Sequence, residues 1–198
     1  MFVIGLTGSM AMGKTTTARL FAEAGVPVHD ADAAVHQLYA GEAAAAIEAV
    51  FPGATRDGKV ERTHLGARVI GNPEALERLE KIVHPLVREA EQRFLRQAEA
   101  TGAPVVLLDI PLLFETGGEN RVDAVVVVSA PPDVQRARAM ERGLSPAQFE
   151  LLLARQLPDG EKRRRADFVV DTSRGIESAR AQVQAILAAV SNMPVRRV

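Results

Sequence analysis

One eight-residue segment near the N-terminus constrains the fold of this 198-residue chain more than any other feature. Residues 8–15, with the sequence GSMAMGKT, fit the pattern G-x-x-x-x-G-K-[ST] without a mismatch. An apolar run at residues 2–7 precedes the segment, and a helical pattern follows it from about Gly13 until Gly25. A glycine-rich turn between a buried strand and a helix directs its backbone N–H groups at one centre. The segment therefore predicts a phosphate-binding loop that takes a nucleoside triphosphate.

The loop residues have distinct expected roles in binding ATP and Mg²⁺. Lys14 supplies an ammonium group to the β- and γ-phosphates, which makes it a candidate catalytic residue. The Thr15 hydroxyl is the predicted metal ligand, for Mg²⁺. The residues expected to contact ATP are Gly8, Ala11, Met12, Gly13, Lys14, Thr15 and Thr16. The alternative is an ordinary glycine-rich turn with an incidental lysine, and the flanking strand and helix argue against it.

Four more short apolar runs predict buried strands, and helical segments separate them. These runs are residues 26–29, 105–108, 124–128 and 168–170. Alternating strands and helices predict an α/β fold, with helices on both faces of a five-stranded parallel sheet in a three-layer arrangement. Asn72-Pro73 and the capping box that opens at Ser145-Pro146 predict helix starts.

Acidic residues follow two of the predicted strands. Ligands of parallel sheets bind beyond the carboxyl ends of the strands, so these carboxylates are site candidates. Asp32 can accept the proton of an attacking hydroxyl and is therefore a candidate catalytic and substrate-binding residue. The alternative is that Asp32 or Asp30 caps a helix starting at Ala33. For Asp109, a structural role and a role behind the metal ion stay equally open.

Composition narrows the function further. The chain has 24 Lys and Arg against 25 Asp and Glu, which argues against a nucleic-acid-binding protein or one that binds anionic membrane. Cysteine is absent, so no thiolate metal site or cysteine nucleophile exists. No apolar run approaches the length of a membrane span and the N-terminus lacks a signal peptide, so we expect a cytoplasmic protein. No Asn-Lys-x-Asp follows a strand, which favours a small kinase over a GTPase.

Several short motifs together resemble one kinase family. In chain order they are Gly5–Gly8 with the phosphate loop, Val28–Asp32, His84-Pro85-Leu86, the PLLFE segment at residues 111–115, residues 136–142 with Gln156, and residues 166–171. This order and spacing resemble the dephospho-coenzyme A kinase family over residues 3–175. The resemblance implies transfer of phosphate from ATP, with Mg²⁺, to the ribose 3′-hydroxyl of dephospho-CoA. The expected partners are therefore these two substrates, and the expected assembly is a monomer or a weak homo-oligomer.

The resemblance also implies a division of the chain. A nucleotide-binding core would comprise residues 1–32, 102–135 and 166–198. Residues 33–101 would form a helical region that binds the CoA substrate, and residues 136–165 would form a lid.

Three positions need a second interpretation beside the implied one. His84 is expected to bind the acceptor, although a residue before Pro85 could also fill space at a helix kink. Glu115 is expected to touch substrate, although the PLLFE segment could serve mainly as an apolar plug. Arg142 is expected to act on the γ-phosphate as a catalytic residue, against the alternative of a solvated helix face.

Two further expectations concern backbone geometry and charge. Ala11 stands where many relatives carry glycine, so the loop is expected to differ slightly there. The basic run at residues 162–165 is expected to be exposed ahead of the last strand.

Two rival functions share the phosphate loop. One is another small P-loop kinase acting on a nucleotide or nucleoside, and the HPL and PLLFE motifs argue against it. The other is a P-loop regulatory protein that hydrolyses nucleotide slowly, which would have no acceptor.

Overall fold

The computed structural model describes residues 1–195, and its centre is a five-stranded sheet. The strands are β1 (Phe2–Gly8), β2 (Val28–Asp30), β5 (Val105–Asp109), β6 (Ala124–Ser129) and β7 (Phe168–Asp171). Their order across the sheet is β2-β5-β1-β6-β7, so β1 lies in the middle. β1 pairs in parallel with both β5 and β6, and β6 pairs in parallel with β7. The predicted α/β fold with a five-stranded parallel sheet is confirmed.

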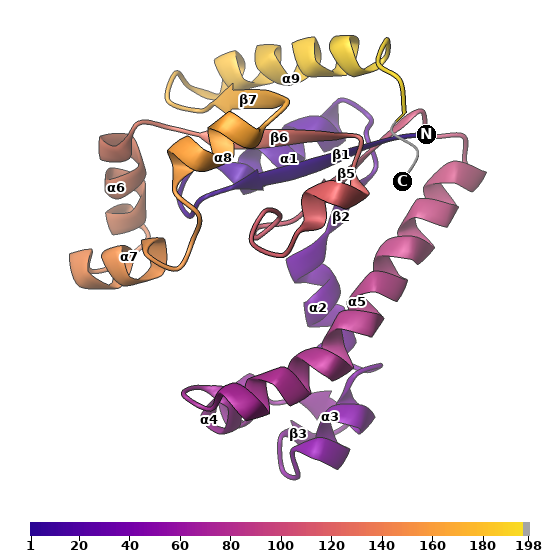
Figure 1. Ribbon diagram of the computed structural model, residues 1–198, viewed down its shortest axis with the longest axis vertical. Helices are drawn as coiled ribbons and strands as arrows, with labels where there is room; N and C mark the ends of the chain where they lie inside the picture. The colour runs from indigo at the N-terminus through magenta and orange to yellow at the C-terminus, as the bar shows by residue number, and fades with distance from the viewer. Residues whose placement is uncertain (196–198) are drawn as a thin grey trace. The chain divides into compact units, whose positions relative to one another are not determined.

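The strands are apolar because helices cover them. Ile4, Leu6, Leu107 and Val126 are fully buried, which places the core on the central strands. Helices α1 (Lys14–Glu23) and α9 (Ile176–Val190) pack together in this layer, and α9 also packs on β7 (Figure 1). The remaining elements here are η1 (Gly118–Arg121), α6 (Pro132–Glu141), α7 (Pro146–Leu153) and α8 (Asp159–Arg165). The basic run at residues 162–165 lies within α8.

The chain forms two compact units. Within the described residues, one comprises residues 1–29 and 98–195, which hold the sheet, and the other comprises residues 30–97. The second unit has its own hydrophobic core, with Leu38, Ile47, Leu65 and Leu79 all buried. Its elements are α2 (Ala31–Tyr39), α3 (Ala44–Val50), β3 (Thr55–Arg56), β4 (Lys59–Val60), α4 (Arg62–Val69) and most of α5 (Pro73–Ala100).

A two-stranded hairpin interrupts the helices of the second unit. β3 and β4 pair antiparallel, with Arg56 opposite Lys59. The turn residues Asp57 and Gly58 both have positive φ, at 51° and 73°. Asp-Gly is the preferred dipeptide of such two-residue hairpin turns, so a signal for the hairpin was present in the sequence.

The predicted helix starts are confirmed by their capping bonds. Ser145 and Gln148 form a reciprocal capping box at the start of α7. The Asn72 side chain accepts the N–H of Ala75 at 3.1 Å in the first turn of α5. Helix α2 begins at Ala31, two residues earlier than expected, because Asp30 is its N-cap. Along residues 1–195, no helix is long and apolar enough to cross a bilayer.

Candidate active site

The phosphate loop connects β1 to α1, as predicted, and its glycines are required by close packing. A Cβ at Gly8 would lie 2.7 Å from the backbone oxygen of Val128, closer than such atoms approach. Gly13 has φ 96°, and a Cβ there would lie 3.2 Å from the Thr172 side chain. The first turn of α1 holds no acidic residue. The positive end of its dipole is therefore available to an anionic ligand.

Ala11 has a left-handed backbone conformation, which glycine adopts more readily than alanine. Its φ is 60°, in the left-handed region that costs alanine about 1–2 kcal/mol. Ala11 therefore carries local backbone strain within the loop. The Ala11 methyl is buried in a small apolar cluster with Ala139 of α6 and Phe149 of α7.

Lys14 is held at the carboxyl end of the neighbouring strand. Its Nζ lies 2.6 Å from Oδ1 of Asp109, the last residue of β5. The Asp109 side chain is 4% exposed, and that of Lys14 is 16% exposed. Asp109 therefore contacts the lysine of the phosphate loop, which the sequence did not predict. The ammonium group keeps an open side toward solvent, where a phosphate could approach.

The residues beside Lys14 fit a magnesium ion bound together with nucleotide. Thr15 and Thr16 are exposed at the start of α1. Mg²⁺ prefers oxygen ligands and usually keeps several waters, with one or two protein oxygens and the substrate phosphates. The Thr15 hydroxyl and the Asp109 carboxylate supply oxygens of this kind. No group of three or more His, Cys, Asp or Glu that could hold a metal by itself occurs within residues 1–195.

A cavity of about 210 Å³ lies beside the first turn of α1. Arg142, the C-cap of α6, lines it together with Thr16 and Thr17. Its other lining residues are Gly13, Arg138, Thr172, Gly175, Ile176 and Ala179. The segment between β7 and α9 was not predicted to contribute to the site. The one signal for it in the sequence was its place after a parallel strand, where ligands of such sheets bind.

Arg138 and Thr172 brace one wall of this cavity. Both terminal nitrogens of Arg138 donate to Thr172 at 2.8 Å, one to Oγ1 and the other to the backbone oxygen. The hydroxyl of Thr172 in turn donates to the backbone oxygen of Met12 at 2.7 Å. Arg138 therefore acts through Thr172 on the loop, whereas Arg142 is exposed.

The two carboxylates after β2 are now distinguished. Asp30 Oδ1 accepts the N–H of Ala33 at 2.9 Å, so Asp30 is the helix cap. Asp32 lies in the first turn of α2 and is exposed. The capping alternative therefore applies to Asp30.

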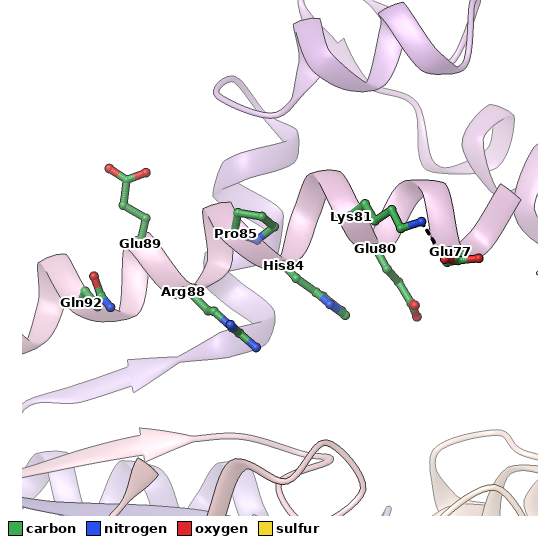
Figure 2. A pocket seen from close by; sticks show the side chains of 8 residues that line it. All are labelled: Glu77, Glu80, Lys81, His84, Pro85, Arg88, Glu89 and Gln92. Carbon is green, nitrogen blue, oxygen red and sulfur yellow. Dashed lines mark ion pairs between the residues drawn. The ribbon is translucent and has the colours of Figure 1, made fainter. Parts of the chain in front are cut away.

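His84 lies on a hollowed face of α5. A pocket of about 590 Å³ is lined by eight α5 residues, including His84, Arg88 and Gln92. Figure 2 shows His84, Arg88 and Glu80 directed to the same side of the helix, while Glu77 and Lys81 pair with each other at 2.7 Å. Helix α5 continues through Pro85, and His84 is exposed at the position just before this proline.

Glu115 is engaged with the protein itself. Its Oε1 lies 2.9 Å from Nζ of Lys162 and accepts the N–H of Leu157 at 2.9 Å. Lys162 is fully buried, so the expectation that the whole basic run is exposed is wrong at this residue. Arg163, Arg164 and Arg165 are exposed as expected. The reason is tertiary, because α8 carries Lys162 to the carboxylate of the PLLFE segment.

The pKa of Glu115 is lowered by these contacts. Burial by itself acts to raise the pKa of the carboxyl, but the nearby Lys162 ammonium and the hydrogen bond from the Leu157 N–H outweigh it. Glu115 is therefore ionised at neutral pH.

Comparison with known proteins gives a consistent result over nearly the full chain. The family model described as dephospho-CoA kinase matches residues 2–178. The dephospho-CoA kinase of Bradyrhizobium diazoefficiens is 63% identical over 198 residues, covering all of both chains. The crystal structure of TT1252 from Thermus thermophilus has a TM-score of 0.84 and 36% identity, covering 96% of this chain and 97% of its own. Dephospho-CoA kinase from Campylobacter jejuni follows with a TM-score of 0.74 and 26% identity, covering 96% and 98%.

Proposed function

The chain belongs to the dephospho-CoA kinase family and catalyses the ATP-dependent phosphorylation of dephospho-CoA, and we propose that Lys14, Arg142 and Asp32 perform the transfer. The observation that supports this assignment is the intact phosphate loop, with Lys14 held 2.6 Å from Asp109 at the end of β5. The alternative of a nucleotide or nucleoside kinase is not favoured, because the family match extends over the motifs that distinguish the acceptor.

The nucleotide is proposed to lie along the phosphate loop. Backbone N–H groups of residues 11–16 and the N-terminus of α1 hold the phosphates. Lys14 stabilises the negative charge that develops on the leaving oxygen. The cavity lined by Thr16, Arg142 and Ile176 is proposed to take the nucleoside end of ATP. Arg142 is exposed at the end of α6, so its guanidinium is free to meet phosphate charge.

Magnesium is proposed to be the metal that accompanies ATP. Thr15 and Asp109 would hold it, and when bound it neutralises charge on the phosphates. The Asp109 carboxylate would then have two roles, because it would orient the Lys14 ammonium and also supply an oxygen to the metal.

Asp32 is proposed to accept the proton of the attacking ribose 3′-hydroxyl. Asp32 follows β2, which neighbours β5 in the sheet. The N-cap of α2 is Asp30, so the Asp32 side chain does not have that role. His84 is proposed to bind the acceptor from the face of α5 that also presents Arg88. For Glu115, the ion pair with Lys162 favours a positioning role in the PLLFE segment over direct contact with substrate.

We also propose residues 136–165 as a lid, a cytoplasmic location, and a monomer or weak homo-oligomer. Supporting the location, the chain has no cysteine and so no disulfide that an oxidising compartment would maintain.

The test is direct. The protein is incubated with ATP, Mg²⁺ and dephospho-CoA, and the product is identified as CoA by mass and by phosphate position. AMP, CMP and uridine serve as competing acceptors and should react poorly. A higher kcat/KM for a simple nucleoside monophosphate would contradict the proposed acceptor.

A further inference from the structure

Two glutamine side chains bind the backbone of a single phosphate-loop residue, Met10. Gln135 Nε2 donates to the Met10 oxygen at 2.9 Å. Gln156 Oε1 accepts the Met10 N–H at 3.1 Å. A carbonyl needs a donor and an N–H needs an acceptor, so the partners themselves define which end of each amide faces the loop. Neither glutamine has a part in the chemistry described above.

The bond from Gln135 has a geometric consequence for the next residue. The Met10 carbonyl and the Ala11 N–H belong to one planar trans peptide, so they point in opposite directions. Holding the carbonyl on the protein side therefore directs the Ala11 N–H away from the protein. Ala11 has φ 60°, a conformation that persists only where the surroundings enforce it.

The same device recurs two residues later. Thr172 Oγ1 donates to the Met12 oxygen at 2.7 Å, and the same peptide group carries the Gly13 N–H on its opposite side. Gly13 is the N-cap of α1, where a phosphate is expected to bind. Two alternate peptides of the loop are thus turned the same way by side-chain donors.

Packed elements carry both glutamines to the loop. Gln135 is 4% exposed and lies on α6. Gln156 follows α7, and its own N–H donates to the Leu153 oxygen at 3.0 Å. The cluster of Ala11, Ala139 and Phe149 joins the loop to α6 and α7. The amides are therefore fixed in place rather than swinging from the surface.

We propose that Gln135 and Gln156 are positioning residues of the phosphate loop. They orient the Met10 peptides so that the Ala11 N–H is presented to the nucleotide phosphates before ATP arrives. The inference rests on the proposed nucleotide site and names the groups that maintain its geometry.

The first test removes the donor. Gln135→Leu should raise the Kd for Mg·ADP about tenfold, which corresponds to about 1.4 kcal/mol and to the loss of roughly one hydrogen bond. The Kd for dephospho-CoA should stay within about twofold of wild type, because the acceptor does not depend on the loop. Both constants are measured by calorimetry on the full-length protein.

The second test exploits the opposite polarity of the two amides. Glutamate can accept the Met10 N–H in place of Gln156 but cannot donate to the Met10 carbonyl in place of Gln135. Gln156→Glu should therefore bind ADP within about threefold of wild type, whereas Gln135→Glu should bind it at least tenfold more weakly. Both variants add the same charge beside the same residue, so the difference between them isolates hydrogen-bond direction.

Gln148→Leu is the matched control, because Gln148 lies on α7 and its side chain bonds within the capping box, away from Met10. It calibrates the change in Tm caused by losing one glutamine, and its ADP affinity should not change. Unaltered ADP affinity in a folded Gln135→Leu protein, equal effects of the two glutamate variants, or equal losses for ADP and dephospho-CoA would each overturn the proposal. If Gln135→Leu does not fold, the glutamate pair decides. A wild-type protein that binds ADP but does not phosphorylate dephospho-CoA would refute the acceptor assignment and leave this inference standing.

Discussion

At the scale of single residues, Asp30 and Asp32 stand two positions apart and differ in what they contact. Asp30 caps α2 through the Ala33 N–H, and Asp32 is exposed in the first turn of the same helix. Asp32 is therefore the candidate for catalysis, and Asp30 is its matched control.

Asp32→Asn should lower kcat by about 10² to 10⁴, the range that general-base groups contribute. Asparagine keeps the shape of the side chain and loses its basicity. Asp30→Asn should leave kcat nearly unchanged, because asparagine caps a helix about as well as aspartate. Single-turnover phosphoryl transfer measures both. A folded Asp32→Asn enzyme within about threefold of wild type would return Asp32 to a structural role.

Ala11 offers a prediction about stability, because opposing effects nearly cancel there. Glycine would relieve about 1–2 kcal/mol of left-handed strain. It would lose about 0.8 kcal/mol of methyl burial against Ala139 and Phe149. It would also gain about 0.4–1 kcal/mol of unfolded-state freedom, which opposes folding.

Ala11→Gly should therefore change the free energy of unfolding by less than about 1 kcal/mol. Ala139→Gly is the control, since it loses a buried methyl and helix propensity without relieving strain, and should cost about 1.5–2 kcal/mol. Urea denaturation of the two variants gives the comparison. A loss above about 2 kcal/mol in Ala11→Gly would show that packing, rather than backbone strain, dominates at this position.

At the scale of elements, the pair of Glu115 and Lys162 joins the PLLFE segment to α8. Lys162 is fully buried, while the Glu115 side chain is 19% exposed. The Lys162 ammonium is held as an ion pair rather than a well-aligned hydrogen bond. Arg165 adds a second connection, because it pairs with Glu119 and its guanidinium carbon lies 4.4 Å from the Phe114 ring centroid.

The unequal burial predicts unequal effects of the two substitutions. Glu115→Gln leaves a buried ammonium without its counter-charge and should cost about 2–4 kcal/mol. Lys162→Met should cost less, about 1.5 kcal/mol or under, because Glu115 can reach water and keeps the Leu157 N–H. Denaturant unfolding at pH 7 measures both. An equal cost, or the reverse order, would contradict the assignment of Lys162 as the desolvated partner.

The pH dependence of this pair has a defined sign. The pKa of Glu115 is lower in the folded protein than its ordinary value of 4.5, so the unfolded chain binds that proton more tightly. The stability due to ionised Glu115 is thus present above pH 4.5 and lost as pH falls through the lowered pKa. The stability difference between wild type and Glu115→Gln should accordingly shrink below about pH 4.5. A difference that grows on acidification would contradict this sign.

At the scale of the whole molecule, the two compact units have separate hydrophobic cores, and we propose that one supports nucleotide binding and the other acceptor binding. One core lies on the sheet, around residues such as Leu107, and the other lies within residues 30–97, around residues such as Leu79. Because the clusters are separate, a cavity in one need not disturb the other.

Leu79→Ala should destabilise the helical unit by about 2–5 kcal/mol and speed hydrogen exchange within residues 30–97. The KM for dephospho-CoA should rise, while the Kd for ADP stays close to wild type. Leu107→Ala is the matched control, expected to raise the Kd for ADP and to speed exchange in the sheet. Loss of ADP affinity in Leu79→Ala equal to that in Leu107→Ala would contradict the division of tasks.

Much of the molecule was determined by the sequence itself, because short-range physics sufficed. The phosphate loop follows from glycine spacing within eight residues, and each strand follows from an uninterrupted apolar run. The capping residues Asn72 and Ser145 act on N–H groups three residues away, so their effect was readable locally. The hairpin at Asp57 was also local, but strands of two residues carry no periodic pattern from which they could be predicted.

Only the tertiary structure decided which distant side chains meet. Gln156 and Met10 are 146 residues apart, and Gln135 and Met10 are 125 apart. The burial of Lys162 within a basic run depended likewise on the path of α8. A glutamine or a lysine can bond many partners, and nothing near it in the chain specifies which one. Its partner is chosen when sheet order and crossovers bring elements together, because contacts at this sequence separation form only once the chain has folded.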